Sequence, residues 1–279
     1  MPDLVDLHVH SNCSDGTYTP AQLVDYALEK GLRAFALTDH DTTEGIAEAQ
    51  EAAKGRGLEV IPGIELSTNY YHRDIHMLGL GIDPENVQFE EWLTAFQNSR
   101  DIRNEKMIQK MQEAGINITW EEMLCRYPDA VWTRAHFARY LIDEGYVRSS
   151  EEAFARYLGD HARCFVPREK VTPFQAVQLI HAGGGKAVLA HPLLYHMSSS
   201  VLEKLVEELV KQGLDGLEAI YSKNRWADEM HMIQLAKRFG LKISGGTDFH
   251  GSNKPGLDLA VGYGKMKIPY ELWERLKEN

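Results

Sequence analysis

Asp6-Leu7-His8-Val9-His10 is the stretch that decides how this chain folds, and Thr247-Asp248-Phe249-His250 matches it near the other end. Side chains two residues apart on a strand point to the same face. The two histidines of the first stretch can therefore converge on one point, and so can Asp248 and His250 of the second. Imidazole and carboxylate together suit first-row divalent ions rather than calcium or a thiolate-bound structural zinc. The two stretches thus predict one metal site built from both ends of the chain.

The size and charge of the chain limit what it can bind. It has 279 residues, enough for one large α/β domain or for a domain with a sizeable insertion. Its formal net charge of −11 repels long DNA, although metal ions can make one pocket locally positive. We therefore expect a small or short anionic substrate and no binding of long DNA.

Cysteine usage and the apolar runs indicate the cellular compartment. Cys13, Cys125 and Cys164 are scattered without a CxxC pair, which fits a reducing compartment. No apolar run approaches the roughly 20 residues of a membrane span. Met1-Pro2-Asp3 lacks the basic and apolar regions of a signal peptide. We expect a cytoplasmic protein that does not act at a membrane.

Seven short apolar runs alternate with amphipathic stretches, which is typical of βα units around a parallel sheet. The runs cover residues 4–7, 33–38, 58–64, 75–81, 186–190, 216–220 and 241–244. Thr19-Pro20-Ala21-Gln22 predicts a helix start with a capping box, and Gly31 predicts the end of that helix. Thr172-Pro173 opens another helix, and the glycines at 183–185 are interpreted as a helix C-terminal turn.

The pattern changes between residues 87 and 167, where helical periods replace strand candidates. Helices are predicted over 89–114, from Thr119, over 133–144 and over 150–158. We therefore predict three segments: the first part of a barrel (1–86), an all-helical insertion (87–167) and the second part of the barrel (168–279). Eight of the fifteen arginines lie between residues 99 and 167. Because guanidinium groups bind phosphate in a bidentate manner, an anion-binding surface is expected there.

Potential metal ligands follow most of the predicted strands. The carboxyl ends of parallel strands all open on one face of a barrel, and the active site lies on that face. Asp15 in the loop after the first strand and His76 at the start of the fourth run are expected to join the same cluster. The nine candidates are too many for one ion, so two or three divalent ions are implied. They are His8, His10, Asp15, His40, Glu65, His76, His191, Asp248 and His250.

Five motifs resemble those of the PHP (polymerase and histidinol phosphatase) superfamily. They are DLHVHS at 6–11, TDHD at 38–41, GIE at 63–65, AHP at 190–192 and SGGTDFHG at 244–251. The insertion, with Trp132-Thr133-Arg134-Ala135-His136 and Tyr157-Leu158-Gly159, is similar to the branch that cleaves nucleoside 3',5'-bisphosphates and trims short RNAs from the 5' end. The resemblance implies an α/β fold, a distorted seven-stranded (β/α) barrel with the helical insertion.

The same resemblance implies how the ligands are shared. One ion would take His8, His10, Glu65 and Asp248, a second would take Asp15, His40 and His250, and a third would take Glu65, His76 and His191. Many relatives carry histidine where this chain has Asp15, a departure that resembles the bisphosphate phosphatases. Mn²⁺ is the leading choice of metal, with Fe²⁺, Zn²⁺ and Mg²⁺ as alternatives.

The expected chemistry is hydrolysis of a phosphate ester by metal-bound hydroxide. The catalytic candidates are His191, His250 and Asp248, and the two histidines are candidates for protonating the leaving group. The resemblance makes Arg134 the phosphate-binding arginine. Further substrate-binding candidates are Arg163, His136 and Lys254. Asp39 and Asp41 are interpreted as carboxylates that orient imidazoles, with a helix cap as an equal alternative for Asp41.

Three functions follow in order of preference. The first is removal of the 3'-phosphate of a 3',5'-bisphosphate, giving AMP and phosphate from the adenosine compound, or 5'-to-3' trimming of short RNA. The second is hydrolysis of histidinol phosphate or another phosphomonoester. The third is a non-catalytic, metal-stabilised module that supports a partner enzyme.

Overall fold

The computed structural model describes residues 3–71, 73–167, 171–264 and 266–278. Met1 and Pro2, on which part of the expectation of no signal peptide rests, lie outside these ranges. Seven strands form one sheet in the order of the sequence. They are β1 Val5–Val9, β2 Ala34–Leu37, β3 Glu59–Tyr70, β4 Arg73–Leu80, β5 Lys186–Leu189, β6 Gly216–Tyr221 and β7 Lys242–Gly246. Each covers much of one predicted run, so the strand predictions are confirmed.

One strand runs against the others. The β1–β2, β2–β3, β5–β6 and β6–β7 pairs are parallel, whereas β4 is antiparallel to both β3 and β5. The expectation of parallel strands throughout is therefore wrong for β4. The reason is the connection: Tyr70 of β3 pairs with Arg73 of β4, so two residues join the strands. A parallel pair needs a crossover of a dozen or more residues.

The first and last strands bring the sheet close to a closed barrel. Val9 forms a parallel bridge with Phe249, just beyond β7. The His10 amide donates to the Phe249 carbonyl at 2.9 Å, and the Asp248 amide donates to the His8 carbonyl at 2.9 Å. The predicted distorted seven-stranded barrel is confirmed, and its closure joins the two stretches that opened the sequence analysis.

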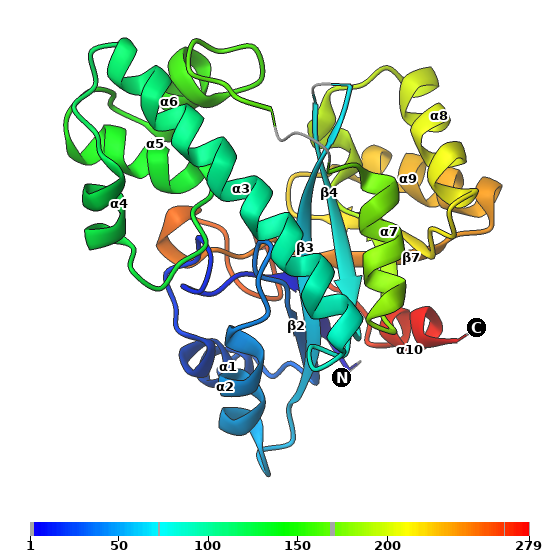
Figure 1. Cartoon of the computed structure of the whole chain (residues 1–279). Helices are drawn as coiled ribbons and strands as arrows, with labels where there is room; N and C mark the ends of the chain where they lie inside the picture. The colour runs from blue at the N-terminus through cyan, green and yellow to red at the C-terminus, as the bar shows by residue number, and fades with distance from the viewer. Residues whose placement is uncertain (1–2, 72, 168–170, 265, 279) are drawn as a thin grey trace.

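Helices cover the outside of the barrel (Figure 1). They are α1 Pro20–Glu29, α2 Gly45–Ala53, α7 Pro173–Ala182, α8 Ser199–Val210, α9 Trp226–Phe239 and α10 Glu271–Lys277. The Thr19 capping box, the positive φ of Gly31 and the Thr172 cap of α7 all stand where the sequence places them. Gly183 caps α7, which confirms the interpretation of the glycine run as a turn. Among the described helices, none is both long and apolar enough to cross a membrane.

A second group of helices lies between β4 and α7 in the sequence. It comprises α3 Val87–Glu113, α4 Trp120–Arg126, α5 Arg134–Asp143 and α6 Ser150–Ala153, continued by the π-helical turn Phe154–Leu158. Phe89, Leu93 and Phe96 of α3 pack into the barrel core, whereas Met107 and Met111 belong to a separate core within this helical group. The helix α3 therefore links the two bodies. The three segment boundaries stay predictions, and residues 168–170, beside one boundary, lie outside the described part.

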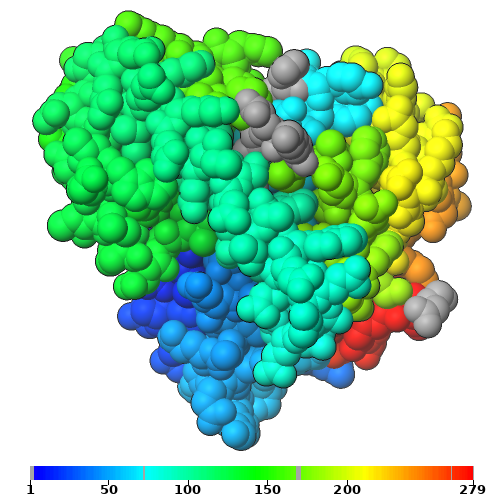
Figure 2. Space-filling view, in the orientation of Figure 1, coloured from blue at the N-terminus to red at the C-terminus, as the bar shows by residue number. Residues whose placement is uncertain are grey.

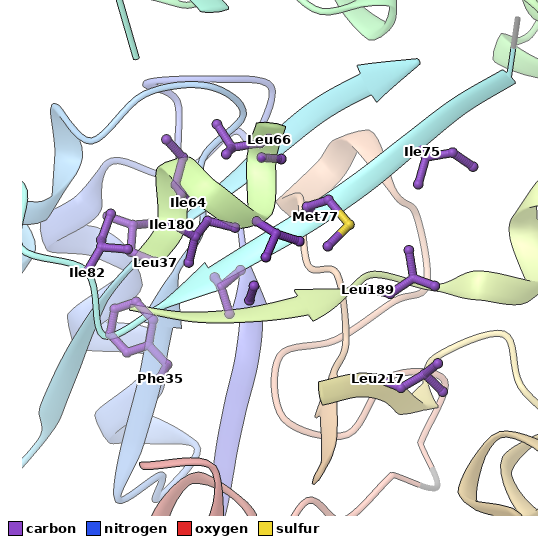
Figure 3. Packing of buried hydrophobic residues seen from close by; sticks show 14 of the residues in the cluster. Phe35, Leu37, Ile64, Leu66, Ile75, Met77, Ile82, Ile180, Leu189 and Leu217 are labelled. Carbon is purple, nitrogen blue, oxygen red and sulfur yellow. The ribbon is translucent and has the colours of Figure 1, made fainter. Parts of the chain in front are cut away.

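Two apolar clusters hold the barrel together. The larger one packs strand side chains such as Phe35, Ile64 and Leu189 against Ile180 of α7 (Figure 3). A smaller one joins Val5, Ala34 and other strand residues to α10. Val5 and Ala34 begin parallel strands, so this cluster includes the end of the barrel opposite the predicted ligands. The opposite end of the barrel contains the buried polar side chains of the candidate ligands.

Candidate metal centre

The candidate ligands converge at the carboxyl ends of the parallel strands. His8 lies near the end of β1, His40 follows β2, His191 follows β5 and Asp248 follows β7. His76 lies near the start of β4, and because β4 is reversed, its start lies at the same end of the barrel. The reversal explains how a residue early in a strand joins ligands that stand at strand ends.

The first group of ligand atoms combines both ends of the chain. His8 Nε2 lies 3.2 Å from Glu65 Oε2 and 3.5 Å from Asp248 Oδ1. His10 Nε2 lies 3.1 Å and 3.4 Å from the same two oxygens. The four residues offer ligand atoms within 4.8 Å of one another, the spacing of a site for one cation. They are the set that the resemblance implies for the first ion.

A second group forms around Asp15. Its Oδ1 lies 3.0 Å from His250 Nε2 and 3.8 Å from His10 Nδ1. Its Oδ2 lies 3.7 Å from His40 Nε2. The group therefore holds the three residues expected for the second ion, and it adds His10.

The third group differs in membership from the expected one. Glu65 Oε1 lies 2.8 Å from His76 Nδ1 and 2.9 Å from His191 Nε2. His40 Nδ1 approaches the other oxygen of Glu65 at 3.3 Å, and His40, Glu65 and His76 form the compact set. Glu65 thus faces all the imidazoles except that of His250, as a bridging ligand must.

Unsatisfied polar atoms test whether a metal fits here. Burying an unpaired polar atom costs free energy, so native structures provide partners for such atoms. Among the described residues, six buried atoms of this cluster have no hydrogen-bond partner: His8 Nε2, His10 Nδ1 and Nε2, Asp15 Oδ1, Glu65 Oε2 and His191 Nδ1. Most of them belong to the groups of converging ligand atoms. The donor set of imidazole nitrogen and carboxylate oxygen fits first-row divalent ions.

The charge balance of the cluster also favours a cation. Burial would raise the pKa of Asp248, but Lys254 and the facing histidines outweigh it and hold that pKa well below its usual value. Burial lowers the pKa of His40 to about 3, so this imidazole is neutral, which is the form that binds metals. Burial would also lower the pKa of His10, but the carboxylates of Asp248 and Glu65 that face its Nε2 raise it to about 9. The ionised carboxylates that favour a proton on the buried His10 imidazole also favour a metal cation at the same place.

Several residues that hold the ligands were missed from the sequence. Glu218 of β6 is fully buried, lies 2.9 Å from His8 Nδ1 and accepts the His191 amide at 2.7 Å. Tyr221 donates its hydroxyl to Asp248 Oδ2 at 2.8 Å. Asp6 accepts the Thr247 amide and hydroxyl and so ties β1 to the loop after β7. The one available signal was a single carboxylate, Glu218, within an otherwise apolar strand.

The two aspartates beside His40 fix loops. Asp39 accepts the Ser11 amide and the hydroxyls of Ser11 and Ser14, so it shapes the loop that carries Asp15. Asp41 forms a buried ion pair with Arg100 at 2.6 Å and accepts the Ser67 amide. The cap position of α2 is Glu44, so the helix-cap alternative for Asp41 is wrong. That the two carboxylates orient imidazoles stays a prediction.

The predicted substrate-binding residues take different positions. Arg134 pairs with Asp74 of β4 at 2.6 Å and with Asp160 at 3.2 Å, so it joins α5 to the strand that carries His76. Lys254 contacts Asp248 Oδ2. His136 is buried, with Nδ1 accepting the Thr133 amide at 3.0 Å, and burial lowers its pKa to about 4. Arg163 is exposed. Substrate contact by each of them stays a prediction.

Comparisons with known proteins agree with this geometry. Residues 6–158 match the model of the PHP domain. A 5'-3' exoribonuclease of Haemophilus influenzae is 39% identical over 250 residues, covering 90% of this chain and 91% of the relative. A 3',5'-nucleoside bisphosphate phosphatase of Chromobacterium violaceum is 34% identical over 276 residues, covering 98% and 96%. The solved structure of an amidohydrolase from Chromobacterium violaceum with bound sulfate shares 33% identity and a TM-score of 0.86, over 98% of this chain and 95% of that one.

Proposed function

This chain belongs to the PHP domain family, and from that membership we propose that it is a metal-dependent hydrolase of small nucleotide phosphate esters. The proposed substrate is a nucleoside 3',5'-bisphosphate, which loses its 3'-phosphate to give the 5'-monophosphate and phosphate. For the adenosine compound the products are AMP and phosphate. The similarity to an exoribonuclease also supports 5'-to-3' trimming of short RNA, which is the same hydrolysis at a phosphodiester.

One observation carries the proposal: three overlapping groups of largely buried ligand residues lie together, each pair of groups sharing one residue (His10, His40 or Glu65), and several of their nitrogens and oxygens have no hydrogen-bond partner. Divalent ions held there would supply an activated water and neutralise phosphate charge. We propose Mn²⁺, with Fe²⁺, Zn²⁺ and Mg²⁺ as alternatives, because nitrogen and oxygen donors are mixed.

The side chains themselves divide the remaining work. Glu218 holds Nδ1 of His8, so His8 Nε2 is the nitrogen left for a metal. His250 Nδ1 donates to the Asp248 carbonyl at 2.9 Å, which directs Nε2 toward Asp15. We propose His191, whose Nδ1 has no protein partner, as the first candidate to give a proton to the leaving oxygen, with His250 as the second because its Nδ1 proton already serves the Asp248 carbonyl. Asp248 is the third proposed catalytic residue.

Arg134 supplies the proposed contact with the second phosphate. Its guanidinium reaches Asp74, two residues from His76, and is partly exposed. A guanidinium at this position can bind a phosphate that is not being cleaved, by the charge-assisted pairing for which its planar shape is suited. Lys254, Arg163 and His136 remain lesser candidates for the same task.

A substrate panel tests the proposal. With Mn²⁺ present, we expect faster phosphate release from a nucleoside 3',5'-bisphosphate than from a 3'-monophosphate or histidinol phosphate. Asp248→Ala should lower kcat/KM at least ~100-fold, as loss of a group that stabilises the transition state does. Arg134→Gln should raise KM for the bisphosphate roughly 10-fold, because a charged hydrogen bond to the second phosphate is lost. The KM for the 3'-monophosphate should stay nearly unchanged. Asp160→Asn is the matched control, since it removes a partner of Arg134 and keeps the guanidinium.

The possible contrary results separate the alternatives. Release from neither bisphosphate nor short RNA would refute the proposed activity. Faster turnover of histidinol phosphate would replace the substrate with a phosphomonoester. Phosphate release that is unchanged in both Asp248→Ala and His191→Ala would not come from this centre, and it would indicate a non-catalytic, metal-stabilised module.

A further inference from the structure

The helical insertion touches the loop that carries Asp15. The Val131 amide donates to the Cys13 carbonyl at 3.0 Å, and the Thr133 hydroxyl donates to Asp15 Oδ2 at 2.7 Å. Because Thr133 engages Oδ2, the unpaired Oδ1 is the oxygen that faces His250. A residue of the insertion thus fixes the orientation of a ligand carboxylate, with Oδ1 toward His250 and Oδ2 toward His40.

A second contact reaches the His40 side of the same group. Arg100 of α3 is buried, with Nε 2.8 Å from Asp41 Oδ2 and Nη2 donating to Ser67 Oγ at 2.7 Å. Asp41 follows His40 in the chain, and Ser67 Oγ lies 3.5 Å from His40 Nδ1. Arg100 therefore fixes both the backbone and a polar neighbour of this imidazole.

The two contacts belong to one packed unit. Arg100 Nη1 and Asn104 Nδ2 both donate to the Trp132 carbonyl, at 3.3 Å and 3.2 Å, directly before Thr133. Trp132 itself is buried in the core of the insertion. In Figure 2 the insertion, in green, rests on the N-terminal residues, in dark blue. A movement of the insertion would disturb Arg100 and Thr133 together.

We infer that the subsite of His10, Asp15, His40 and His250 is linked to docking of the helical insertion, with Thr133 and Arg100 as positioning residues. The barrel supplies the four ligands, and the insertion holds two of them in place. Binding a cation there stabilises the docked insertion, and the docked insertion raises affinity for the cation by the same factor. The inference rests on the metal centre of the proposed function, not on the identity of the substrate.

Hydrogen exchange on the full-length, metal-stripped protein tests the linkage. Adding Mn²⁺ should slow amide exchange in residues 97–104 and 131–136 of the wild type. Thr133→Val should reduce this protection and weaken Mn²⁺ binding to one subsite about 10-fold in calorimetry, the effect of losing a partner that orients a ligand. Thr133→Ser, which keeps the hydroxyl, should restore both.

Thr119→Val is the matched control. Thr133 caps α5 and Thr119 caps α4, each through its hydroxyl, and the capping-box contacts of Thr119 are with Glu122. The Thr119→Val variant should have a lower free energy of unfolding, because it loses a helix cap, but it should keep wild-type affinity for Mn²⁺. If Thr133→Val does not fold, Ser67→Ala removes the hydroxyl between Arg100 and His40 and should weaken the same subsite.

Each outcome has one meaning. Mn²⁺ binding with unchanged exchange in the insertion, or with wild-type affinity in Thr133→Val, overturns the linkage and leaves the proposed function standing. Protection of the insertion without phosphate release overturns the proposed function alone. Absence of Mn²⁺ binding in the wild type overturns both.

Discussion

At the scale of single residues, Glu218 is not one of the candidate ligands, but it holds two of them in position. Its carboxylate lies against His8 Nδ1 and accepts the His191 amide, so it fixes residues from two strands. A carboxylate on the far nitrogen of an imidazole sets the tautomer and raises the basicity of the nitrogen that binds the metal. Burying this charge is favourable only because both oxygens are hydrogen-bonded.

Glu218→Gln should therefore weaken metal binding. The two contacts are made by different oxygens of Glu218, and glutamine replaces one of these oxygens with an NH2 group, which cannot accept a hydrogen bond. We expect a 10- to 100-fold higher Mn²⁺ concentration for half-maximal activity, with recovery in excess metal. Glu208→Gln, which changes a carboxylate that accepts the Tyr70 hydroxyl, should keep the wild-type dependence. An unchanged Mn²⁺ titration in Glu218→Gln would show that the pairing with His8 does not tune the site.

At the scale of elements, the reversed strand β4 and the seam between β1 and β7 position the ligands. The reversal brings His76 to the ligand end. The seam brings His8 and Asp248 within backbone hydrogen-bonding distance. Gly246 ends β7 at this seam, and a Cβ there would lie 2.2 Å from His8 Cβ and 2.7 Å from the His8 amide nitrogen. The seam closes only because this residue has no side chain.

Gly246→Ala should consequently open the seam. We expect a loss of at least ~3 kcal/mol in the free energy of unfolding, the upper range for overpacking, together with loss of bound metal. Gly240→Ala is the control, because Gly240 has a φ of +69° and nothing within 4 Å of its Cβ position. It should cost only ~1 kcal/mol. Denaturant unfolding and metal analysis of both variants measure the difference, and equal losses would contradict the proposed role of the seam.

At the scale of the whole molecule, the metal centre joins segments from both parts of the barrel. A ligand that binds only the folded state stabilises it by ~2.7 kcal/mol at 100 times its Kd. Chelation of bound metal should therefore lower Tm by several degrees. Thermal unfolding with and without chelator measures the shift. In Asp248→Ala, the chelator should lower Tm by less than in the wild type. An equal Tm of the wild type with and without chelator would contradict the coupling of metal binding to folding.

The local features of this fold could be predicted because they depend on neighbouring residues. The Thr19 and Thr172 caps, the Gly31 turn and the strand runs each lie within a few positions of one another. The direction of β4 follows from its two-residue connection to β3. The predicted strand run ends at residue 64, six residues before the end of β3, so the run alone does not reveal this short connection. Pairings such as Glu218 with His8 and Arg100 with Asp41 join residues 210 and 59 positions apart, and no local pattern records them.

The sequence by itself determined the family, the seven strands, the helical region and the residue types that stand at strand ends. It could do so because periodicity, capping and motif spacing are properties of short stretches. Only the tertiary structure decided which oxygen of Asp15 faces His250, which nitrogen of His8 has no protein partner, and that Thr133 contacts Asp15 while Arg100 contacts Ser67. These choices depend on the distance between side chains from separate elements, which is fixed when the barrel closes and the insertion packs against it.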